Sequence, residues 1–275
     1  MENLCRMNAS VFDLFRLNGT VALIVGGARN LGYDMAAALA EAGSDLVITS
    51  RTILSATRAA EALANAFKIE VLPLALDHRR HEDVATVVNR AKEWKGRIDI
   101  LVNNAGGGSG RSPAHLFTRD PREVEDLIAV NLTGVLHCCQ AVGRIMAEQR
   151  QGKIISIASI AALVGRDRRV YERNGLKGQP IDYAAAKAGI LGMTRDLAGL
   201  LSPFGVCVNA ISPGGFERED MPRGFVQDYS ERTPLGRMGR DGVDLKGAAL
   251  FLASRASDYV TGHNLVVDGG FSLWR

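Results

Sequence analysis

Residues 20–32, TVALIVGGARNLG, hold the pattern from which the architecture of this chain can be worked out. The first half is a short apolar run rich in β-branched residues, typical of a strand buried on both faces of a parallel sheet. The second half, from Gly26 to Gly32, is a glycine-rich turn that leads into a segment of helical composition, residues 31–42. Such glycines let the backbone turn sharply and approach a pyrophosphate at the helix N-terminus. The motif therefore predicts a dinucleotide site, with a plain strand-to-helix turn as the alternative when it is taken alone.

The rest of the chain repeats this alternation of apolar strands and helices. Further strands are predicted at residues 45–49, 70–75, 98–102, 153–157, 206–211 and 265–267. Further helices are predicted at residues 55–67, 83–94, 121–150, 182–201 and 241–254. Pro73 cannot donate a ladder hydrogen bond, which predicts that the third strand lies at a sheet edge. We therefore expect an α/β protein with one doubly wound Rossmann fold, a parallel seven-stranded sheet in the order 3-2-1-4-5-6-7 with helices on both faces.

Composition sets limits on function. The chain has 275 residues, of which 47% are hydrophobic and 23% are charged, and this excludes a disordered or collagen-like protein. Its net charge of +3, from 33 basic and 30 acidic residues, argues against nucleic acid or an anionic membrane as the partner. No apolar run approaches the ~18 residues of a membrane span. The four cysteines and five histidines form no metal signature, so we expect a cytoplasmic protein without a metal.

The end of the second predicted strand bears on the choice of dinucleotide. A carboxylate about 20 residues past the glycine turn would hold the ribose 2′-hydroxyl of NAD. This chain has Ser50 and Arg51 there instead. Arg51 and Arg29 could converge on a 2′-phosphate, which suits a guanidinium fork. The sequence therefore favours NADP(H), with NAD(H) as the second choice, and the alternative is that either arginine is merely solvated.

Several short motifs, taken in order, resemble the classical short-chain dehydrogenases/reductases from Gly19 to Gly270. They are the glycine turn, Asn103-Asn104-Ala105-Gly106, Asn131, Ser159, Tyr183-Ala184-Ala185-Ala186-Lys187, Ser212-Pro213-Gly214, and the stretches 259–262 and 268–270. Within that family the chain resembles gluconate 5-dehydrogenase-like and 3-oxoacyl-carrier-protein reductase-like members most closely. The resemblance implies an oxidoreductase that interconverts a secondary alcohol and a ketone with a nicotinamide cofactor.

Tyr183 and Lys187 stand at positions i and i+4, so on a helix they share one face. A neighbouring ammonium is expected to lower the pKa of a phenol, which is ordinarily near 10. The resemblance implies that Tyr183 exchanges a proton with the substrate oxygen and that Lys187 also holds the nicotinamide ribose. It further implies that Ser159 hydrogen-bonds the substrate oxygen and that Asn131 holds a water of the proton relay.

The predicted dinucleotide site collects residues from the ends of several strands. They are Gly26, Arg29, Asn30, Leu31, Gly32, Ser50, Arg51, Asp77, Asn104, Ala105, Gly106, Tyr183, Lys187, Pro213 and Gly214. Asn30 stands where the family usually has glycine, but asparagine tolerates a left-handed backbone. By resemblance Asp77 contacts the adenine, and its alternative role is to cap the next helix. Thr261 and Gly262 are expected to build the fold, and Val266 and Val267 to lie in the core.

The largest departure from the family lies between Ser159 and Tyr183, where typical relatives have a much shorter connection. Here residues 165–178, GRDRRVYERNGLKG, form an apparent inserted loop with five basic and two acidic residues. A basic loop beside a reaction centre favours an anionic substrate such as a sugar acid. An interface or a solvated surface loop is the alternative. Residues 216–240 are predicted to form a substrate lid.

These observations divide the chain into an N-terminal extension, residues 1–18, and a single dehydrogenase domain, residues 19–275. The leading function is an NADP(H)-dependent oxidoreductase acting on a small polar anion. The alternatives are a 3-oxoacyl-carrier-protein reductase and a catalytically silent dinucleotide sensor. The helices predicted at 121–150 and 182–201 carry apolar residues beyond the needs of one core face, and relatives pair these helices. We therefore expect a homotetramer, with residues 271–275 near a second interface.

Overall fold

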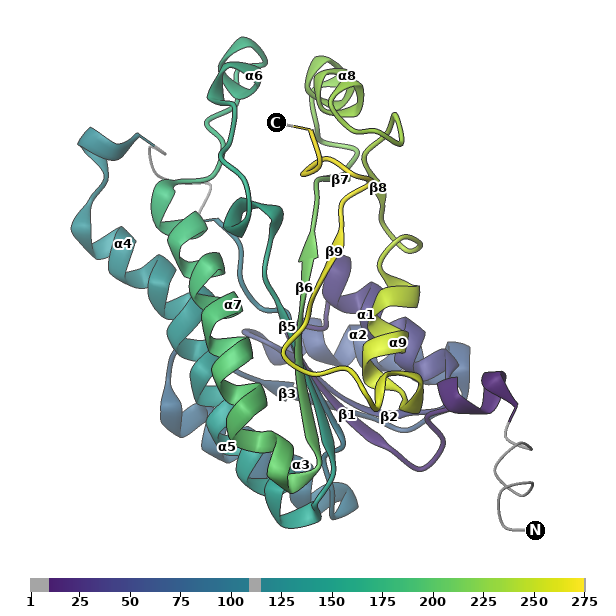
Figure 1. The fold of residues 1–275 in the computed structure, drawn as a ribbon. Coiled ribbons are helices and arrows are strands. Elements are labelled where there is room, and N and C mark those ends of the chain that lie inside the picture. The colour runs from purple at the N-terminus through teal and green to yellow at the C-terminus, as the bar shows by residue number, and fades with distance from the viewer. Residues whose placement is uncertain (1–9, 109–114, 275) are drawn as a thin grey trace.

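A computed structural model describes residues 10–108 and 115–274. Its centre is a seven-stranded parallel sheet in the order β3-β2-β1-β4-β5-β6-β9, which confirms the predicted architecture and strand order (Figure 1). The strands are β1 (Val21–Val25), β2 (Asp45–Ser50), β3 (Val71–Ala75), β4 (Ile100–Asn103), β5 (Gly152–Ile157), β6 (Val206–Pro213) and β9 (Asn264–Val267). The seventh strand is numbered β9 because β7 (Phe216–Glu217) and β8 (Gly239–Arg240) form a separate pair.

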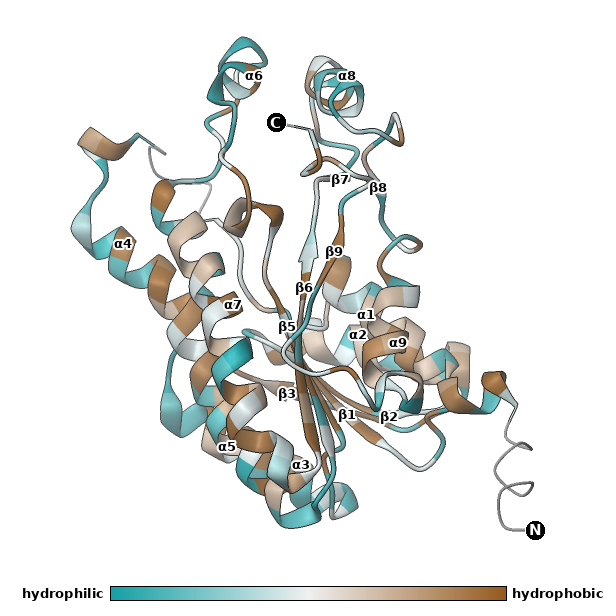
Figure 2. Ribbon diagram, in the orientation of Figure 1, coloured by the Kyte–Doolittle hydropathy of each residue, from teal (hydrophilic) through white to brown (hydrophobic). Residues whose placement is uncertain are grey.

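Helices cover both faces of this sheet, and each face has its own apolar core (Figure 1). One face carries α1 (Asn30–Glu41), α2 (Ile53–Phe67) and α9 (Lys246–Ala253). The other carries α3 (His81–Lys95), α5 (Gly134–Gln149) and α7 (Ile181–Leu201). Apolar residues gather where these helices meet the strands, and polar residues lie toward solvent (Figure 2). The sheet is therefore buried on both sides, as the near-continuous apolar strands predict.

The two edge strands of the sheet explain the position of Pro73 and the exposure of Val266. β3 pairs only with β2, so Pro73 lies at an edge, as predicted. β9 forms the opposite edge, and the side chain of Val266 there is 38% exposed. The prediction that Val266 lies in the core is thus wrong, because β9 has a neighbouring strand on one side only and its side chains are less covered than those of the inner strand β6. Thr261 has the expected structural role, since its hydroxyl accepts a 3.0 Å hydrogen bond from the Val208 amide.

The segment predicted as one helix at 121–150 contains α4 (Pro121–Ile128), a π-helical turn (Ala129–Thr133) and α5. Contrary to the sequence analysis, Pro121–Gln149 is long and apolar enough to cross a membrane by length and composition alone. Its apolar residues, however, include Val135, Val142 and Met146 of the sheet-packing core. The core packing explains this apolar composition, as in other helices that line a sheet. The helix predicted at 241–254 is shorter, because residues 241–245 form a turn before α9.

The inserted segment and the predicted lid pack on each other beyond the carboxyl ends of the strands (Figure 1). The insertion contains a short helix, α6 (Arg168–Arg173), and the lid segment contains α8 (Arg223–Glu231). Val170 of α6 and Phe225 and Tyr229 of α8 belong to a third apolar cluster, separate from the two cores of the sheet. We call this pair of elements the cap.

Candidate active site

Lys187 and Tyr183 both project from α7. Lys187 is only 3% exposed, and its ammonium donates a 2.7 Å hydrogen bond to the carbonyl oxygen of Ile157 at the end of β5. The same nitrogen lies 5.8 Å from the centroid of the Tyr183 ring. The two side chains are therefore neighbours on one helix face, and the carboxyl end of β5 fixes the position of the ammonium.

Ser159 follows β5 and faces the same site. Its hydroxyl oxygen accepts a 3.1 Å hydrogen bond from the Ala161 amide, which leaves its hydrogen available to a partner. Burial raises the pKa of Tyr183, while a side-chain hydrogen bond with Ser159 and the charge of Arg166 oppose that rise. Desolvation of the phenolate outweighs these opposing interactions, so the pKa of Tyr183 lies above its usual value. The phenol thus stays protonated at neutral pH. The expectation that Lys187 lowers this pKa stays a prediction.

Asn131 lies in the π-helical turn and is fully buried, at 0% exposure. Its amide nitrogen donates to the carbonyl oxygens of Leu127 and Gly107, both at 3.0 Å, and its oxygen accepts from the Gly107 amide at 2.9 Å. The side chain therefore holds the loop after β4 in place. Its predicted part in a proton relay stays a prediction.

Gly106 joins these groups into one site. A Cβ at this position would lie 2.7 Å from the Asn131 side-chain oxygen and 3.3 Å from the Lys187 ammonium nitrogen. The backbone there runs directly beside both side chains, and any larger residue would push them apart. The structure thus brings Asn131, Lys187 and the loop after β4 together.

The glycine turn packs against that loop. The Asn104 side chain donates a 2.9 Å hydrogen bond to the Gly26 carbonyl oxygen, and a Cβ on Gly26 would come within 2.8 Å of the Ala105 Cα. Gly32 is packed as closely, because a Cβ added there would lie 2.2 Å from the Gly26 carbonyl oxygen. Asn30 adopts a left-handed backbone with φ 51°, so asparagine serves here in place of glycine.

The other residues predicted to bind the dinucleotide lie at neighbouring strand ends or just after them. Leu31 stands in the first turn of α1, Ser50 ends β2, and Pro213 ends β6. The Gly214 amide donates a 2.9 Å hydrogen bond to Val267, and a Cβ there would lie 2.9 Å from the Asp268 Cα.

The Arg29 and Arg51 side chains are exposed, and within residues 10–108 and 115–274 neither makes an ion pair. Both guanidinium groups are thus free to meet a 2′-phosphate.

Asp77 follows β3, as the sequence indicates, but it does not cap the next helix. Its carboxylate pairs with the Arg79 guanidinium at 2.6 Å and accepts from the Arg79 amide. Helix α3 begins at His81, and the residue before it is Arg80. The helix-cap alternative is therefore wrong, and the adenine contact of Asp77 stays a prediction.

Sequence reasoning missed His78. The residue is 6% exposed, and its Nε2 lies 2.8 Å from the carbonyl oxygen of Val130 in the π-helical turn. Since a carbonyl can only accept, Nε2 must carry the hydrogen. The ring also lies against Gly134, where a Cβ would come 2.3 Å from its Cδ2. His78 thus supports the turn that carries Asn131, a role that needs the tertiary fold to be recognised.

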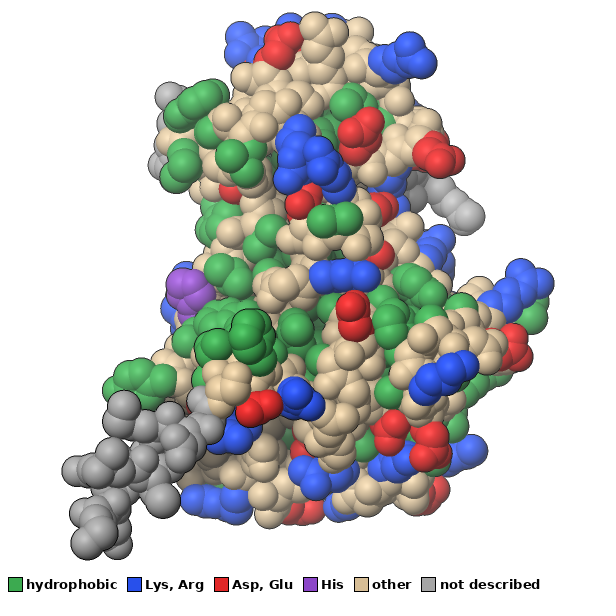
Figure 3. All heavy atoms as spheres, turned by 90° about the vertical axis from the view of Figure 1, so that its right-hand side faces the viewer, with side chains coloured by type: hydrophobic (Ala, Val, Ile, Leu, Met, Phe, Trp, Pro, Cys, Tyr) green, Lys and Arg blue, Asp and Glu red, His purple; other side chains and the backbone are tan. Residues whose placement is uncertain are grey.

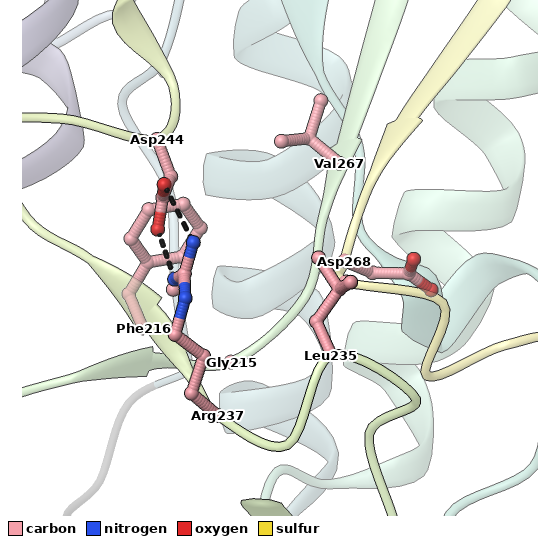
Figure 4. Close-up of a pocket in the computed structure, with 9 residues that line it drawn as sticks. Gly215, Phe216, Leu235, Arg237, Asp244, Val267 and Asp268 are labelled. Atoms are coloured by element: carbon pink, nitrogen blue, oxygen red, sulfur yellow. Dashed lines mark hydrogen bonds and ion pairs between the residues drawn. The ribbon is translucent and has the colours of Figure 1, made fainter.

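A small cavity of about 130 Å³ lies between the predicted lid and the end of β9, and its lining includes Gly215, Phe216 and Leu235 (Figure 4). Arg237 and Asp244 close one side of it by two hydrogen bonds, one of them 3.0 Å long (Figure 4). None of the four predicted catalytic residues lines this cavity. This cavity is therefore distinct from the group of predicted catalytic residues.

Comparison with known proteins fits this geometry. A family model described as enoyl-(acyl carrier protein) reductase matches residues 26–272. The chain belongs to the short-chain dehydrogenase/reductase family. Family membership makes it an oxidoreductase that acts on CH–OH groups.

Individual relatives cover nearly the whole chain. The chain is 38% identical over 266 residues to 5-keto-D-gluconate 5-reductase of Escherichia coli (strain K12), covering 94% of this chain and 97% of that protein. It is 33% identical over 259 residues to a 3-oxoacyl-acyl-carrier-protein reductase of Aquifex aeolicus, covering 93% and 98%. A solved gluconate 5-dehydrogenase of Burkholderia cenocepacia, in complex with NADP and tartrate, superposes with a TM-score of 0.86 at 35% identity, covering 97% and 100%.

Lys187 makes the stability of this dehydrogenase depend on pH. Burial lowers its pKa from 10.5 to about 8, so between those values the folded enzyme binds fewer protons than the unfolded chain. The cost of burying the charged ammonium is present in full below about pH 8 and is relieved as the pH rises toward 10.5. We expect the free energy of unfolding of the wild type to rise relative to that of Lys187→Met over this range. Urea unfolding of both proteins at about pH 7 and pH 10 measures the difference, and a constant difference would contradict the assignment.

Replacing His78 with alanine is expected to destabilise the enzyme. The change removes the donor to the Val130 carbonyl and should lower the free energy of unfolding by about 1–3 kcal/mol. Urea unfolding would measure it. His81→Ala is the matched control, because His81 is exposed at the start of α3 and should cost little. Equal losses in the two variants would show that the Val130 hydrogen bond adds nothing.

Proposed function

We propose that this enzyme is an NADP(H)-dependent oxidoreductase that interconverts a secondary alcohol and a ketone on a small polar anion such as a sugar acid. The observation that carries the reaction type is the convergence of Tyr183, Ser159 and Lys187 at the end of β5. The relative solved with NADP and the dianion tartrate supports both the cofactor and the substrate class. The domain division given above, with residues 216–240 as a substrate lid, is part of the proposal.

The dinucleotide fits the residues present. The close packing of Gly26 and Gly32 makes the glycine turn a cradle that any Cβ would fill. Arg29 and Arg51 would hold the 2′-phosphate, and the remaining ammonium hydrogens of Lys187 would hold the nicotinamide ribose. When bound, NADPH supplies the hydride that reduces the ketone carbon.

The chain's own residues handle the proton. Tyr183 donates its phenolic proton to the ketone oxygen, and the raised pKa keeps that proton in place at neutral pH. The Ser159 hydroxyl donates a hydrogen bond to the same oxygen and orients it. In the reverse direction the phenolate accepts the proton of the alcohol, so both directions use the same pair.

A 3-oxoacyl-carrier-protein reductase is the second candidate, and a relative with that activity supports it. Docking of an acidic carrier protein would need a surface of unpaired basic side chains near the site. Arg173 of the insertion instead pairs with Asp228, and Arg169 and Arg232 both pair with Asp167. On the face shown in Figure 3, acidic and basic side chains are interspersed. These ion pairs favour a small anion, and the full proton-transfer set argues against a silent sensor.

The proposal also covers assembly and location. Large apolar side chains are exposed on several elements: Leu136 of α5 and Leu200 of α7, and Leu235 and Leu273, which line a shared hollow with Val266 of β9. Covering these exposed side chains is what a homotetramer would do. Residue 275 of the expected second interface lies outside the described residues. We place the enzyme in the cytoplasm, where the free thiols of Cys138, Cys139 and Cys207 would stay reduced. Light scattering would measure the assembly.

A substrate panel tests the proposal. Sugar keto acids, neutral ketoses and a 3-oxoacyl carrier substrate would each be supplied with NADPH and with NADH, and absorbance of the reduced cofactor would be followed. We expect turnover of a keto acid with NADPH to exceed all others. Preferred turnover of the carrier substrate would establish the second candidate instead.

A further inference from the structure

Ion pairs join two charges of the insertion, Asp167 and Arg173, to the lid. Among the described residues, three cations of the insertion form no ion pair: Arg166, Arg168 and Lys177. The Asp167 carboxylate forms ion pairs with the guanidinium groups of Arg169, at 2.9 Å, and of Arg232 in the lid, at 2.7 Å. Arg173 pairs with Asp228 of α8 at 2.7 Å. Arg166, at the start of the insertion, makes no ion pair with any carboxylate in the part of the chain that the structure describes.

Arg166 is held in place by neutral partners. Its Nη1 donates a 2.7 Å hydrogen bond to the carbonyl oxygen of Gln179, and its guanidinium carbon lies 5.9 Å from the centroid of the Tyr171 ring. The Arg166 side chain also forms a hydrogen bond with the Tyr171 side chain, so two of its five N–H groups are used. The remaining N–H groups of the guanidinium stay available to donate two hydrogen bonds to one carboxylate in bidentate geometry.

Contacts through Gln179, Gly108 and Gly107 connect Arg166 with Asn131 of the candidate active site. The Gln179 side chain lies on Gly108, where a Cβ would come 1.3 Å from its Oε1. The adjacent Gly107 is bound by Asn131 on both its amide and its carbonyl. Gln179 also lies two residues before the start of α7, which carries Tyr183. The positive charge of Arg166 is close enough to lower the pKa of Tyr183 against the effect of burial.

Resting on the function proposed above, we propose that Arg166 is the residue that binds the carboxylate of the substrate and thereby selects anionic ketones. A half-buried guanidinium that is oriented by Gln179 and Tyr171 and lacks a protein carboxylate is suited to a ligand carboxylate. Binding there would leave the ketone of the same molecule within reach of Tyr183. The insertion thus supplies substrate selection to a site whose chemistry lies on β5 and α7.

Two substrates that differ only in charge test the assignment. 5-Keto-D-gluconate carries the carboxylate, and L-sorbose has the same carbon chain with a hydroxymethyl group in its place. In Arg166→Gln, KM for 5-keto-D-gluconate should rise by roughly 10- to 100-fold, while KM for L-sorbose changes less than about twofold. Arg166→Lys should recover part of the loss, because it keeps the charge without the fork. Lys177→Gln, which removes an exposed cation of the same insertion, is the matched control and should change neither KM.

A binding measurement separates this assignment from the proposed function. Calorimetry with D-gluconate and with the neutral D-glucitol would be run on the NADP complex of the wild type and of Arg166→Gln. We expect only gluconate affinity to fall, and this result would support the anion site even if neither ketone were turned over. Equal losses for both ligands, an unchanged gluconate affinity, or no gluconate binding to the wild type would each overturn the assignment. A shift of the pH profile alone, with equal effects on both ketones, would overturn it in favour of a purely electrostatic effect on Tyr183.

Discussion

Tyr183→Phe is expected to lower turnover by about 10²- to 10⁴-fold, the usual contribution of a positioned general acid. The change removes only the hydroxyl, so the packing of α7 and the dinucleotide cradle should be unaffected. Without it the ketone oxygen has no positioned proton donor. Turnover of the substrate found by the panel, and NADPH affinity by fluorescence titration, would be measured for the variant and the wild type. The fall should appear in turnover, with NADPH affinity retained.

Two companion variants assign the neighbouring roles. Ser159→Ala should lower turnover with NADPH affinity nearly unchanged, because its hydroxyl faces the substrate oxygen. Lys187→Ala should lower both turnover and NADPH affinity, because its ammonium lies beside Tyr183 and would hold the nicotinamide ribose. Near wild-type turnover in Tyr183→Phe would contradict the assignment, and the proton would then have to come from elsewhere. Tyr171, beneath the Arg166 guanidinium, would be the first residue to examine.

Arg51→Asp is expected to reverse the preference for the dinucleotide. The arginine would lose its charge-assisted contact with the 2′-phosphate, and the new carboxylate would repel that phosphate while accepting a ribose hydroxyl. NADPH affinity should fall by at least about 10- to 100-fold, and NADH affinity should rise. Dissociation constants for both cofactors, measured by fluorescence, would show the reversal.

Arg58→Asp is the control for this change. Arg58 is an exposed arginine of α2, so its replacement alters the net charge equally, away from the end of β2. It should leave the ratio of the two dissociation constants nearly unchanged. If the wild type bound NADPH and NADH equally well, the role given to Arg51 and Arg29 would be wrong.

The sheet could be predicted from the sequence because its signals are local. Apolar runs mark the strands, glycines mark the turn after the first strand, and Pro73 marks an edge strand. The strand order follows from the alternation of strands and helices. The grouping of Ser159, Tyr183 and Lys187 could also be predicted, since two of them share one helix and the third follows a strand closely. The left-handed backbone of Asn30 likewise agrees with the residue type.

The features that could not be predicted depend on contacts between distant segments. The raised pKa of Tyr183 reflects burial beneath the rest of the site. The π-helical turn at Asn131 is supported by His78, more than 50 positions earlier in the chain. Asp167 pairs with Arg232, and Arg173 pairs with Asp228, so the packing of the insertion depends on partners in the lid that are distant in the sequence. Exposure of Val266 likewise depends on which strand forms the edge.

The third apolar cluster, with Val170, Phe225 and Tyr229, has a bearing on how such an enzyme can diversify. Because the cap has its own small core, a substitution there does not have to be accommodated by the two cores that hold the sheet. On the assignments proposed above, substrate selection and chemistry lie in separate parts of the chain. A lineage could exchange the insertion and α8 together, acquire a new substrate, and keep its hydride-transfer machinery intact throughout.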